Sequence, residues 1–412
     1  MRNILILGKS AKEFALAKQL SETYKVYVLP GSVAMEEFAT IVDSQIDDVH
    51  KIVEFVLEND ISLTIVADEE FVSQELMETY QNNDLQIFSP NHSFIDLIKD
   101  KVAVKKFLYR LRIQTPRFAS FDKANVAYDY IKNARFPLLL KSNLGEYATI
   151  CVNEKIAKTA VDDLVLRDEQ ILIEEYIHGQ TFTAYFVSDG YKALPIGTAQ
   201  NYNFALDGDG GVLTNGIGSC SPFYKLTDAH IDYLTSSVAT PIIESFEHQG
   251  SPVCAIFGVE AILTSDDSIY ISNLKNFVSD ADAQGILALL DIDLVKVIDD
   301  CLLGTFADIY DYIPQKDLYA LSSVLSARVD EEVISGVKNL DENTRFSYYV
   351  ATKNRYLELL TRKGKVLNVT TCAGTISRAR DLLYSEIEEI DFKTKSYRKD
   401  IGALIAGNRG LL

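Results

Sequence analysis

The sequence Met1-Arg2-Asn3-Ile4-Leu5-Ile6-Leu7-Gly8-Lys9-Ser10 sets the fold class of the first hundred residues. Its consecutive apolar residues, 4–7, predict a short buried strand that ends at Gly8, and the amphipathic pattern through Phe14 and Leu20 predicts a helix. An apolar run this short, interrupted at once by glycine, lysine and serine, reads neither as a signal peptide nor as a membrane span.

The same alternation continues to about residue 100. Further apolar strands are predicted over 26–29, 63–66 and 86–88, and an amphipathic helix precedes the second of them. Strands separated by amphipathic helices are typical of a parallel sheet with helices on both faces. We therefore expect residues 1–100 to form a doubly wound α/β domain.

The remainder of the chain predicts two further domains, which makes the protein a multidomain α/β and α+β chain. A long helical pattern over 91–111 leads into short strands around one helix, the size of a small α+β lid over about 117–188. Residues 200–222 are rich in Asn, Asp, Gly and Ser without periodicity, so we expect a structureless functional loop. Patterns beyond about residue 315 indicate a C-terminal α+β domain. The expected ranges are 101–312 for the central domain and 313–412 for the last.

The charge balance argues against several kinds of partner. The 412 residues include 40 Lys and Arg against 59 Asp and Glu, a net charge of −19. A surface this acidic repels phosphate backbones and anionic lipid, so we expect no nucleic-acid partner, no membrane partner and a cytoplasmic location. An anionic metabolite requires a local cluster of Lys or Arg. Five cysteines without a CxxC pair argue against a disulfide framework and structural zinc.

Three lysines are candidates for holding phosphate. Lys101 and Lys105 lie one turn apart on one face of a predicted helix, and Lys141 ends an apolar strand. Ammonium groups that meet from a helix and a strand can clamp phosphate oxygens as point charges. The alternative is that each lysine is simply solvated. Gly8-Lys9-Ser10 is not a P-loop, because the upstream glycine is missing, although its turn can present helix amides to an anion.

Two acidic segments are candidates for contacts with a nucleotide and its metal. Glu174-Glu175-Tyr176-Ile177 follows a predicted strand, and the backbone of such a linker suits the edge of an adenine base; a solvated strand end is the alternative. Glu260 lies inside the apolar strand 253–263. A buried carboxylate is rare unless it is paired or binds a metal. Glu260 is therefore either a ligand for Mg²⁺ or the partner of an unidentified Lys or Arg.

Together these residues resemble the ATP-grasp superfamily, in the order Asp100-Lys101, Thr115-Pro116, Lys141, Glu174-Glu175 and Glu260. The whole chain is more closely similar to the phosphoribosylamine–glycine ligase (glycinamide ribonucleotide synthetase) family. The features that carry this resemblance include Pro30-Gly31, Phe88-Ser89-Pro90, Asp207-Gly208-Asp209, the run from Thr214 to Pro222, and the tail from Tyr397 to Gly402.

The resemblance implies an ATP-grasp fold and a place in de novo purine biosynthesis. In the family's reaction ATP converts glycine to an acyl phosphate, which the amine of phosphoribosylamine attacks, with ATP and Mg²⁺ as cofactors. The ATP-binding residues so implied are Lys101, Lys105, Lys141, Glu174, Glu175, Tyr176, Ile177 and Thr181. The substrate-binding residues are Lys12, Glu69, Asp209, Thr214, Lys275 and Arg398, and the metal ligand is Glu260.

The sequence departs from the family pattern around the expected site. The replaced segments are Ser10-Ala11-Lys12, Ala67-Asp68-Glu69, the lid loop Leu144-Gly145-Glu146-Tyr147, Thr181 at the ribose-binding glutamate, and Asn201-Tyr202-Asn203-Phe204. The family's Glu-x-Asn metal pair falls at Ser272 and Leu274, although Asn273 and Asp280 can partly substitute if the strand register slips. Removing one well-placed charge stabiliser typically lowers a rate by about 100- to 1,000-fold. We therefore expect a weak Mg²⁺ site.

Three functions remain open at this stage. The first is a diverged phosphoribosylamine–glycine ligase with weakened activity. The second is a catalytically inactive paralogue that binds a nucleotide or a protein partner. The third is an ATP-grasp ligase that has moved to another acid and amine, with 67–69 and 201–204 as new substrate contacts.

Overall fold

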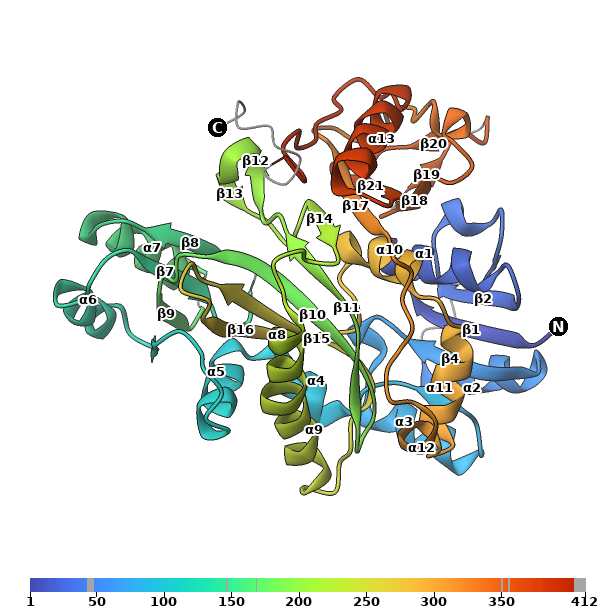
Figure 1. Cartoon of the computed structure of the whole chain (residues 1–412), viewed down its shortest axis with the longest axis horizontal. Coiled ribbons are helices and arrows are strands. Elements are labelled where there is room, and N and C mark those ends of the chain that lie inside the picture. Colours follow the sequence, from blue (N-terminus) through green and yellow to red (C-terminus); the bar gives the residue numbers. More distant parts are fainter. Residues whose placement is uncertain (43–47, 146, 168, 350, 355, 404–412) are drawn as a thin grey trace.

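The computed structural model describes residues 1–42, 48–145, 147–167, 169–349, 351–354 and 356–403 (Figure 1). The N-terminal unit is a five-stranded parallel sheet in the order β3-β2-β1-β4-β5. Its strands are β1 (Asn3–Gly8), β2 (Lys25–Pro30), β3 (Thr40–Ile41), β4 (Ile61–Val66) and β5 (Ile87–Phe88), and its helices are α1 (Ala11–Leu20), α2 (Val49–Glu58) and α3 (Gln74–Asn82). The order reverses at β1, so the predicted doubly wound sheet is confirmed.

The sheet is covered on both faces, because residues 4–7 of β1 are all apolar and buried. Ile4 and Ile6 pack into one core cluster, and Leu5 and Leu7 pack into another. Side chains of a strand alternate between the two faces. A continuous apolar run is therefore what a doubly covered central strand requires.

The helix predicted over 91–111 is wrong, because the structure contains two helices there. They are α4 (His92–Lys99) and α5 (Lys101–Arg110). Asp100 separates them in an extended conformation (φ −105°, ψ 101°), and its carboxylate accepts a hydrogen bond from the Ala103 N–H at 2.7 Å. Such a cap starts a new helix without disturbing the apolar periodicity, so the pattern did not reveal the break.

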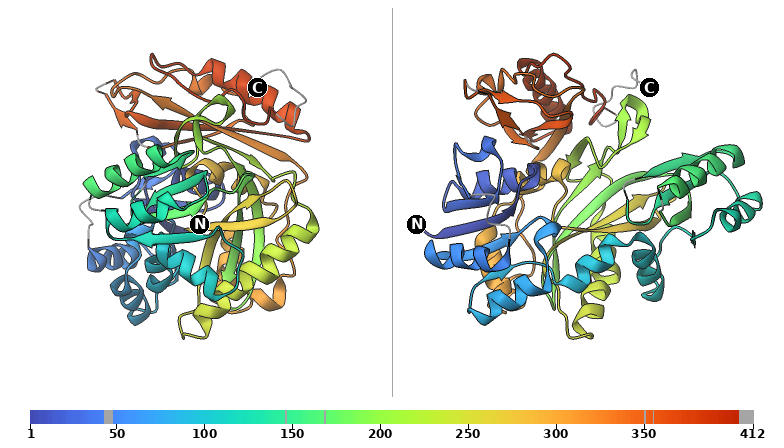
Figure 2. Two further views of the ribbon diagram at one scale, coloured as in Figure 1. Left: turned by 90° about the vertical axis from the view of Figure 1, so that its left-hand side faces the viewer. Right: turned by 180° about the vertical axis from the view of Figure 1, so that it is seen from behind.

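A four-stranded sheet in the order β6-β9-β7-β8 lies at the opposite end of the molecule from the N-terminus (Figures 1 and 2). Its elements are β6 (Phe118–Phe121), α6 (Ala124–Lys132), β7 (Leu138–Ser142), β8 (Ala148–Cys151), α7 (Glu154–Leu166) and β9 (Ile171–Glu175). The prediction of one helix was wrong, since α6 also packs here. It buries only Ala127 and Ile131, so its apolar face is narrow.

An eight-stranded antiparallel sheet, in the order β16-β15-β10-β11-β14-β17-β21-β18, connects the rest of the chain. Its strands are β10 (Gln180–Asp189), β11 (Ala193–Asn201), β14 (Gly218–Ser221), β15 (Cys254–Leu263), β16 (Ile269–Asn276), β17 (Tyr319–Ala327), β18 (Arg345–Tyr348) and β21 (Gly364–Ala373). β14 pairs with β17, so a single sheet contains strands from both sides of residue 312. The domain ranges 1–100, 101–312 and 313–412, and the lid at 117–188, stay predictions.

The helices around this sheet complete the fold. They are α8 (Asp228–Tyr233), a π-helical segment (Leu234–Ala239), α9 (Thr240–Glu247), α10 (Asp280–Leu289), α11 (Leu294–Leu302), α12 (Phe306–Ile309) and α13 (Ile376–Glu389). The short pair β19 (Thr352–Lys353) and β20 (Leu359–Leu360) lies beyond them. Within the described ranges, no helix has the length and apolarity to cross a membrane.

The structureless loop predicted over 200–222 is also wrong. The segment forms a hairpin of β12 (Phe204–Leu206) and β13 (Gly210–Leu213), followed by β14. The hairpin is held from the far end of the chain, because the Asp400 carboxylate accepts the Gly208 N–H at 2.8 Å and the Asp207 carboxylate accepts the Lys399 N–H at 2.8 Å. The composition of a segment does not reveal its contacts with residues so far away in the sequence.

Gly8 provides a test of the turn that joins β1 to α1. Its φ is +143°, and a Cβ atom there would lie 2.5 Å from the Glu13 side chain. We expect Gly8→Ala to lower the free energy of unfolding by about 3 kcal/mol, because strain and overlap add. Urea unfolding followed by circular dichroism measures the change.

The matched control is Gly374→Ala, since a Cβ atom there meets nothing within 4 Å. It should change the stability by less than about 0.5 kcal/mol. Equal effects of the two substitutions would contradict the described turn.

Candidate functional site

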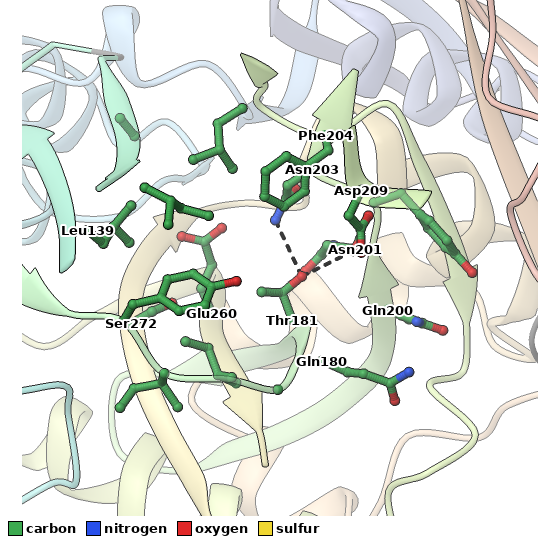
Figure 3. A pocket seen from close by; sticks show the side chains of 18 of the residues that line it. Leu139, Gln180, Thr181, Gln200, Asn201, Asn203, Phe204, Asp209, Glu260 and Ser272 are labelled. Atoms are coloured by element: carbon green, nitrogen blue, oxygen red, sulfur yellow. Dashed lines mark hydrogen bonds between the residues drawn. The ribbon is translucent and has the colours of Figure 1, made fainter. Parts of the chain in front are cut away.

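A cavity of about 480 Å³ lies where the four-stranded sheet meets the edge of the large sheet. Leu139 and Ile150 contribute apolar wall from β7 and β8, and Ile262 contributes it from β15. Figure 3 shows Thr181, Asn201 and Asn203 near one another, with Leu139, Glu260 and Ser272 across the cavity. All the residues predicted to contact the base and ribose line it, namely Glu174, Glu175, Tyr176, Ile177 and Thr181.

The linker after β9 is fixed by its own backbone. The Glu175 N–H donates to the Arg117 carbonyl at 2.9 Å, and the Tyr176 N–H donates to the Pro137 carbonyl at 3.3 Å. The Thr181 hydroxyl donates to the Asn201 carbonyl at 3.1 Å and accepts from the Asn203 amide at 3.5 Å. The rim of the cavity is therefore ordered by protein contacts alone, which suits a flat ligand such as adenine.

The Glu174 carboxylate joins two of the predicted lysines. Lys105 Nζ lies 3.3 Å from one oxygen, and Lys141 Nζ lies 3.2 Å from the other. Glu174 and Lys105 are each only 1% exposed. Burial raises the pKa of Glu174, but the two ammonium groups outweigh burial and lower it. Burial lowers the pKa of Lys105 to about 8, against the opposing effect of Glu174.

The three lysines do not face one ligand as the sequence suggested. Lys101 and Lys141 line a second, larger cavity of about 1160 Å³, whereas Lys105 lies behind Glu174 and lines neither cavity. Lys105 donates instead to the Thr115 hydroxyl at 3.0 Å. Lys105 is therefore paired inside the protein with Glu174 and Thr115, and its contact with ATP phosphate stays a prediction.

Lys101 fixes the loop that follows β7. Its ammonium donates to the Gly145 carbonyl at 2.6 Å and to the Asn143 carbonyl at 3.2 Å. The Asn143 side chain accepts the Val102 N–H at 2.8 Å. The first turn of α5 is thus bonded to the lid loop, of which Glu146 lies outside the described residues.

The larger cavity supplies the local positive charge that an acidic chain needs to hold an anion. The two cavities adjoin, since Lys141, Glu174 and Glu260 line both. The described lysines around the larger one are Lys12, Lys99, Lys101, Lys141, Lys275 and Lys365, and the acids are Glu69, Glu174, Glu260 and Asp280. Ammonium groups therefore outnumber carboxylates here, although the whole chain carries a net charge of −19.

Lys275 is the partner that the sequence left unidentified for Glu260. Its Nζ lies 2.7 Å from Glu260 Oε1. Glu260 lies opposite Asn273 in the strand pairing, and a β-bulge follows it. The substitution of Asn273 for a family metal ligand stays a prediction. Burial raises the pKa of Glu260, but Lys275 and then Lys141 outweigh it and lower the pKa.

The N-terminus of α1 forms another wall of the larger cavity. Asp280 accepts hydrogen bonds from the Ser10 hydroxyl at 2.6 Å and the Lys12 N–H at 2.9 Å. Glu13, which sequence reasoning passed over, is fully buried and accepts from the Ser10 N–H at 2.8 Å. The position of this acidic residue among the apolar residues of α1 was the signal in the sequence that it is buried. Lys12 and Glu69 line the cavity beside these groups.

The remaining predicted substrate contacts divide between the cavities. Thr214 lines the larger one, and Asp209 and Arg398 line the smaller one. Arg398 is 2% exposed and donates to Asp209 at 2.9 Å, to Asp400 at 2.7 Å and to the Phe204 carbonyl at 3.1 Å. Its bonds hold the β12–β13 hairpin, so direct substrate contacts of Arg398 and Asp209 stay predictions.

Comparison with known families identifies this arrangement. Residues 2–97 match the N domain of phosphoribosylglycinamide synthetase, residues 99–281 match its ATP-grasp (A) domain, and residues 326–404 match its C domain. The chain belongs to the phosphoribosylamine–glycine ligase family. The resemblance in the sequence and the ATP-grasp fold are both confirmed.

Named relatives match over nearly their whole length. The phosphoribosylamine–glycine ligase of Halalkalibacterium halodurans is 26% identical, over 99% of this chain and 98% of its own. That of Yersinia pestis is 27% identical, over 97% and 98%. The ligase structure from Thermotoga maritima has a TM-score of 0.80 at 20% identity, over 97% of this chain and all of its own.

A more distant structure shows the breadth of the fold. The biotin carboxylase domain of Hydrogenobacter thermophilus 2-oxoglutarate carboxylase, in complex with MgADP, ADP and bicarbonate, has a TM-score of 0.71 at 15% identity. It covers 96% of this chain and 91% of its own. Membership in an ATP-grasp family implies the use of ATP with Mg²⁺.

The residues present fit a nucleotide but not a protein-held Mg²⁺. Among the described residues no three His, Cys, Asp or Glu side chains gather as metal ligands. Glu260 is held by an ammonium at 2.7 Å, and its neighbour Asn273 offers only an amide oxygen, which is buried and unbonded. Mg²⁺ prefers carboxylates and phosphate oxygens, so an ion bound at Glu260 Oε1 would have to displace Lys275.

The buried contact between Lys105 and Glu174 can be tested by removing one charge. We expect Glu174→Gln to lower the free energy of unfolding by about 3 kcal/mol, because the Lys105 ammonium is left buried without a counter-charge. Chemical denaturation measures the loss. The double variant Lys105→Met with Glu174→Gln should recover most of it, and a double variant as unstable as the single one would contradict the assignment.

Glu13 predicts a pH dependence of stability. Burial raises its pKa to about 7, from an ordinary value of 4.5. Between these values the folded state keeps a proton that the unfolded state has lost, so stability falls as pH rises from about 4.5 to 7. A shift of this size corresponds to about 3 kcal/mol.

Glu13→Gln removes the titrating group and keeps an acceptor for the Ser10 N–H. The stability of the variant relative to the wild type should therefore increase between pH 5 and pH 7.5, as measured by urea unfolding at each pH. A constant difference across this range would refute the raised pKa.

Proposed function

We propose that the chain is an ATP-dependent carboxylate–amine ligase that joins glycine to phosphoribosylamine in purine biosynthesis, with weakened activity. The observation that supports this is the pair of adjoining cavities. One has apolar walls and an ordered backbone rim for a base, and the other is lined by lysines and acids for phosphates and small polar substrates.

The chain's own groups suit the steps of such a reaction. The glycine carboxylate would attack the terminal phosphorus of ATP, ADP would leave, and the amine would displace phosphate from the acyl phosphate. Lys141 and Lys275 would bind the negative oxygens during phosphoryl transfer, where positioning and charge stabilisation account for most of the acceleration. Glu69 and Asp280 would orient the amine through its N–H groups.

The weakened activity is inferred from two features of the site. Lys275 occupies the Glu260 carboxylate, and Thr181 presents a hydroxyl that is already bonded to Asn201 and Asn203 where a ribose-binding carboxylate is expected. Each lost charged contact typically lowers a rate by about 100-fold or more. Their combination predicts slow turnover.

The same ion pair supports a second candidate, a catalytically inactive nucleotide-binding paralogue with a protein partner. A third candidate is a ligase for another acid and amine, since Glu69 and Asn203 line the larger cavity at the two altered segments.

Phosphate release from ATP with Mg²⁺, glycine and phosphoribosylamine, combined with mass detection of the amide product, separates the three candidates. Product formation supports the proposal. ATP binding without turnover supports the second candidate. ATP turnover that requires another acid or amine supports the third and overturns the assigned substrates.

Lys141 tests the nucleotide site itself. We expect Lys141→Met to raise the dissociation constant of ATP by about 10- to 100-fold, because a charge-assisted hydrogen bond to phosphate is lost. Isothermal titration calorimetry measures the change. Lys132→Met, on the exposed face of α6, is the control and should leave ATP affinity unchanged; an unchanged affinity in Lys141→Met would place the phosphates elsewhere.

A further inference from the structure

The Lys275 ammonium lies on the strand pair β15–β16, where both strands line the cavities. Gly258 lies directly opposite Lys275 in the strand pairing and adds no side chain. Glu260 lies opposite Asn273, diagonal to Lys275, and 2.7 Å separate Lys275 Nζ from Glu260 Oε1. Both residues line the larger cavity, with side chains 29% and 23% exposed. The pair is therefore within reach of a ligand.

The Lys275 ammonium is a permanent cation at neutral pH. Burial lowers its pKa, but the Glu260 carboxylate outweighs burial, and the buried Asp282 adds to the effect, so the pKa is raised. The groups that face it from other elements are Glu260 on β15, Asp282 on α10 and Lys12 on α1. Both carboxylates favour the charged form, and Lys12 opposes it, as burial does.

The charge around the cavity matches a polyanion without added metal. Among the described residues that line it, six are lysines and four are acids. The lysine-rich wall therefore supplies from the protein what Mg²⁺ otherwise brings with the nucleotide.

We infer that Lys275 takes the place of a divalent cation beside Glu260, and that the site binds a nucleoside triphosphate as the metal-free anion. Glu260 fixes the ammonium in the free protein, and the incoming phosphate oxygens share it. The inference rests on the proposed function, because it concerns the same nucleotide site, but it concerns binding and not turnover.

The test compares ATP affinity in excess Mg²⁺ and in EDTA at equal ionic strength, by isothermal titration calorimetry on the full chain. The wild type should bind ATP in both conditions, with dissociation constants within about threefold. Lys275→Met should weaken metal-free binding by about 10- to 100-fold, the effect of losing a charge-assisted contact. Lys275→Arg keeps the charge and should bind metal-free ATP like the wild type.

Lys275→Glu is the sharpest variant, because it sets a second carboxylate beside Glu260. It should abolish metal-free binding and make ATP affinity depend on Mg²⁺ by tenfold or more. Circular dichroism of each variant verifies that it is folded.

The outcomes separate this inference from the proposed function. ATP binding by the wild type only in Mg²⁺, or Lys275→Met binding metal-free ATP like the wild type, overturns the inference and leaves the ligase assignment intact. Failure of ATP to bind in either condition overturns both. Metal-independent binding that is lost in Lys275→Met supports the inference even if no product forms.

Discussion

The Glu174 carboxylate, shared between Lys105 and Lys141, is the contact on which the arrangement of the site depends. It connects α5, β7 and β9 at a point that is 1% exposed. Burying any one of these three charged groups alone would cost free energy. The pairing of the carboxylate with two ammonium groups compensates that cost. The four-stranded sheet, the linker after β9 and the Lys141 side chain are consequently positioned by one carboxylate.

The same physical solution recurs around the larger cavity. Lys275 pairs with Glu260, and the α1 N-terminus is bonded to Asp280 and to the buried Glu13. Each contact places an ammonium or an N–H group against a carboxylate, and the contact of Lys12 with Asp280 joins segments that are distant in the sequence. An acidic chain thereby maintains a locally positive cavity, and the cations are held at fixed positions by protein carboxylates.

The sequence predicted what depends on local periodicity. The apolar strand at Ile4–Leu7 and the linker after Glu174 both formed as expected, because one short segment contains the whole signal. The interaction partners of individual side chains could not be predicted in this way. Whether Lys105 faces a ligand or Glu174, and whether Glu260 holds a metal or Lys275, depends on strand register and on contacts between distant segments. The same limit explains the hairpin at 204–213, which is ordered by Arg398 and Asp400 from the end of the chain.

The position of the cation beside Glu260 tests the account most directly. A crystal of the protein with a non-hydrolysable ATP analogue and Mn²⁺, examined by anomalous scattering, locates metal and ammonium in one experiment. The account predicts that Lys275 Nζ stays within hydrogen-bond distance of Glu260 and of a phosphate oxygen, with no Mn²⁺ bound to Glu260. A Mn²⁺ ion coordinated by Glu260 and Asn273, with Lys275 displaced, would contradict it.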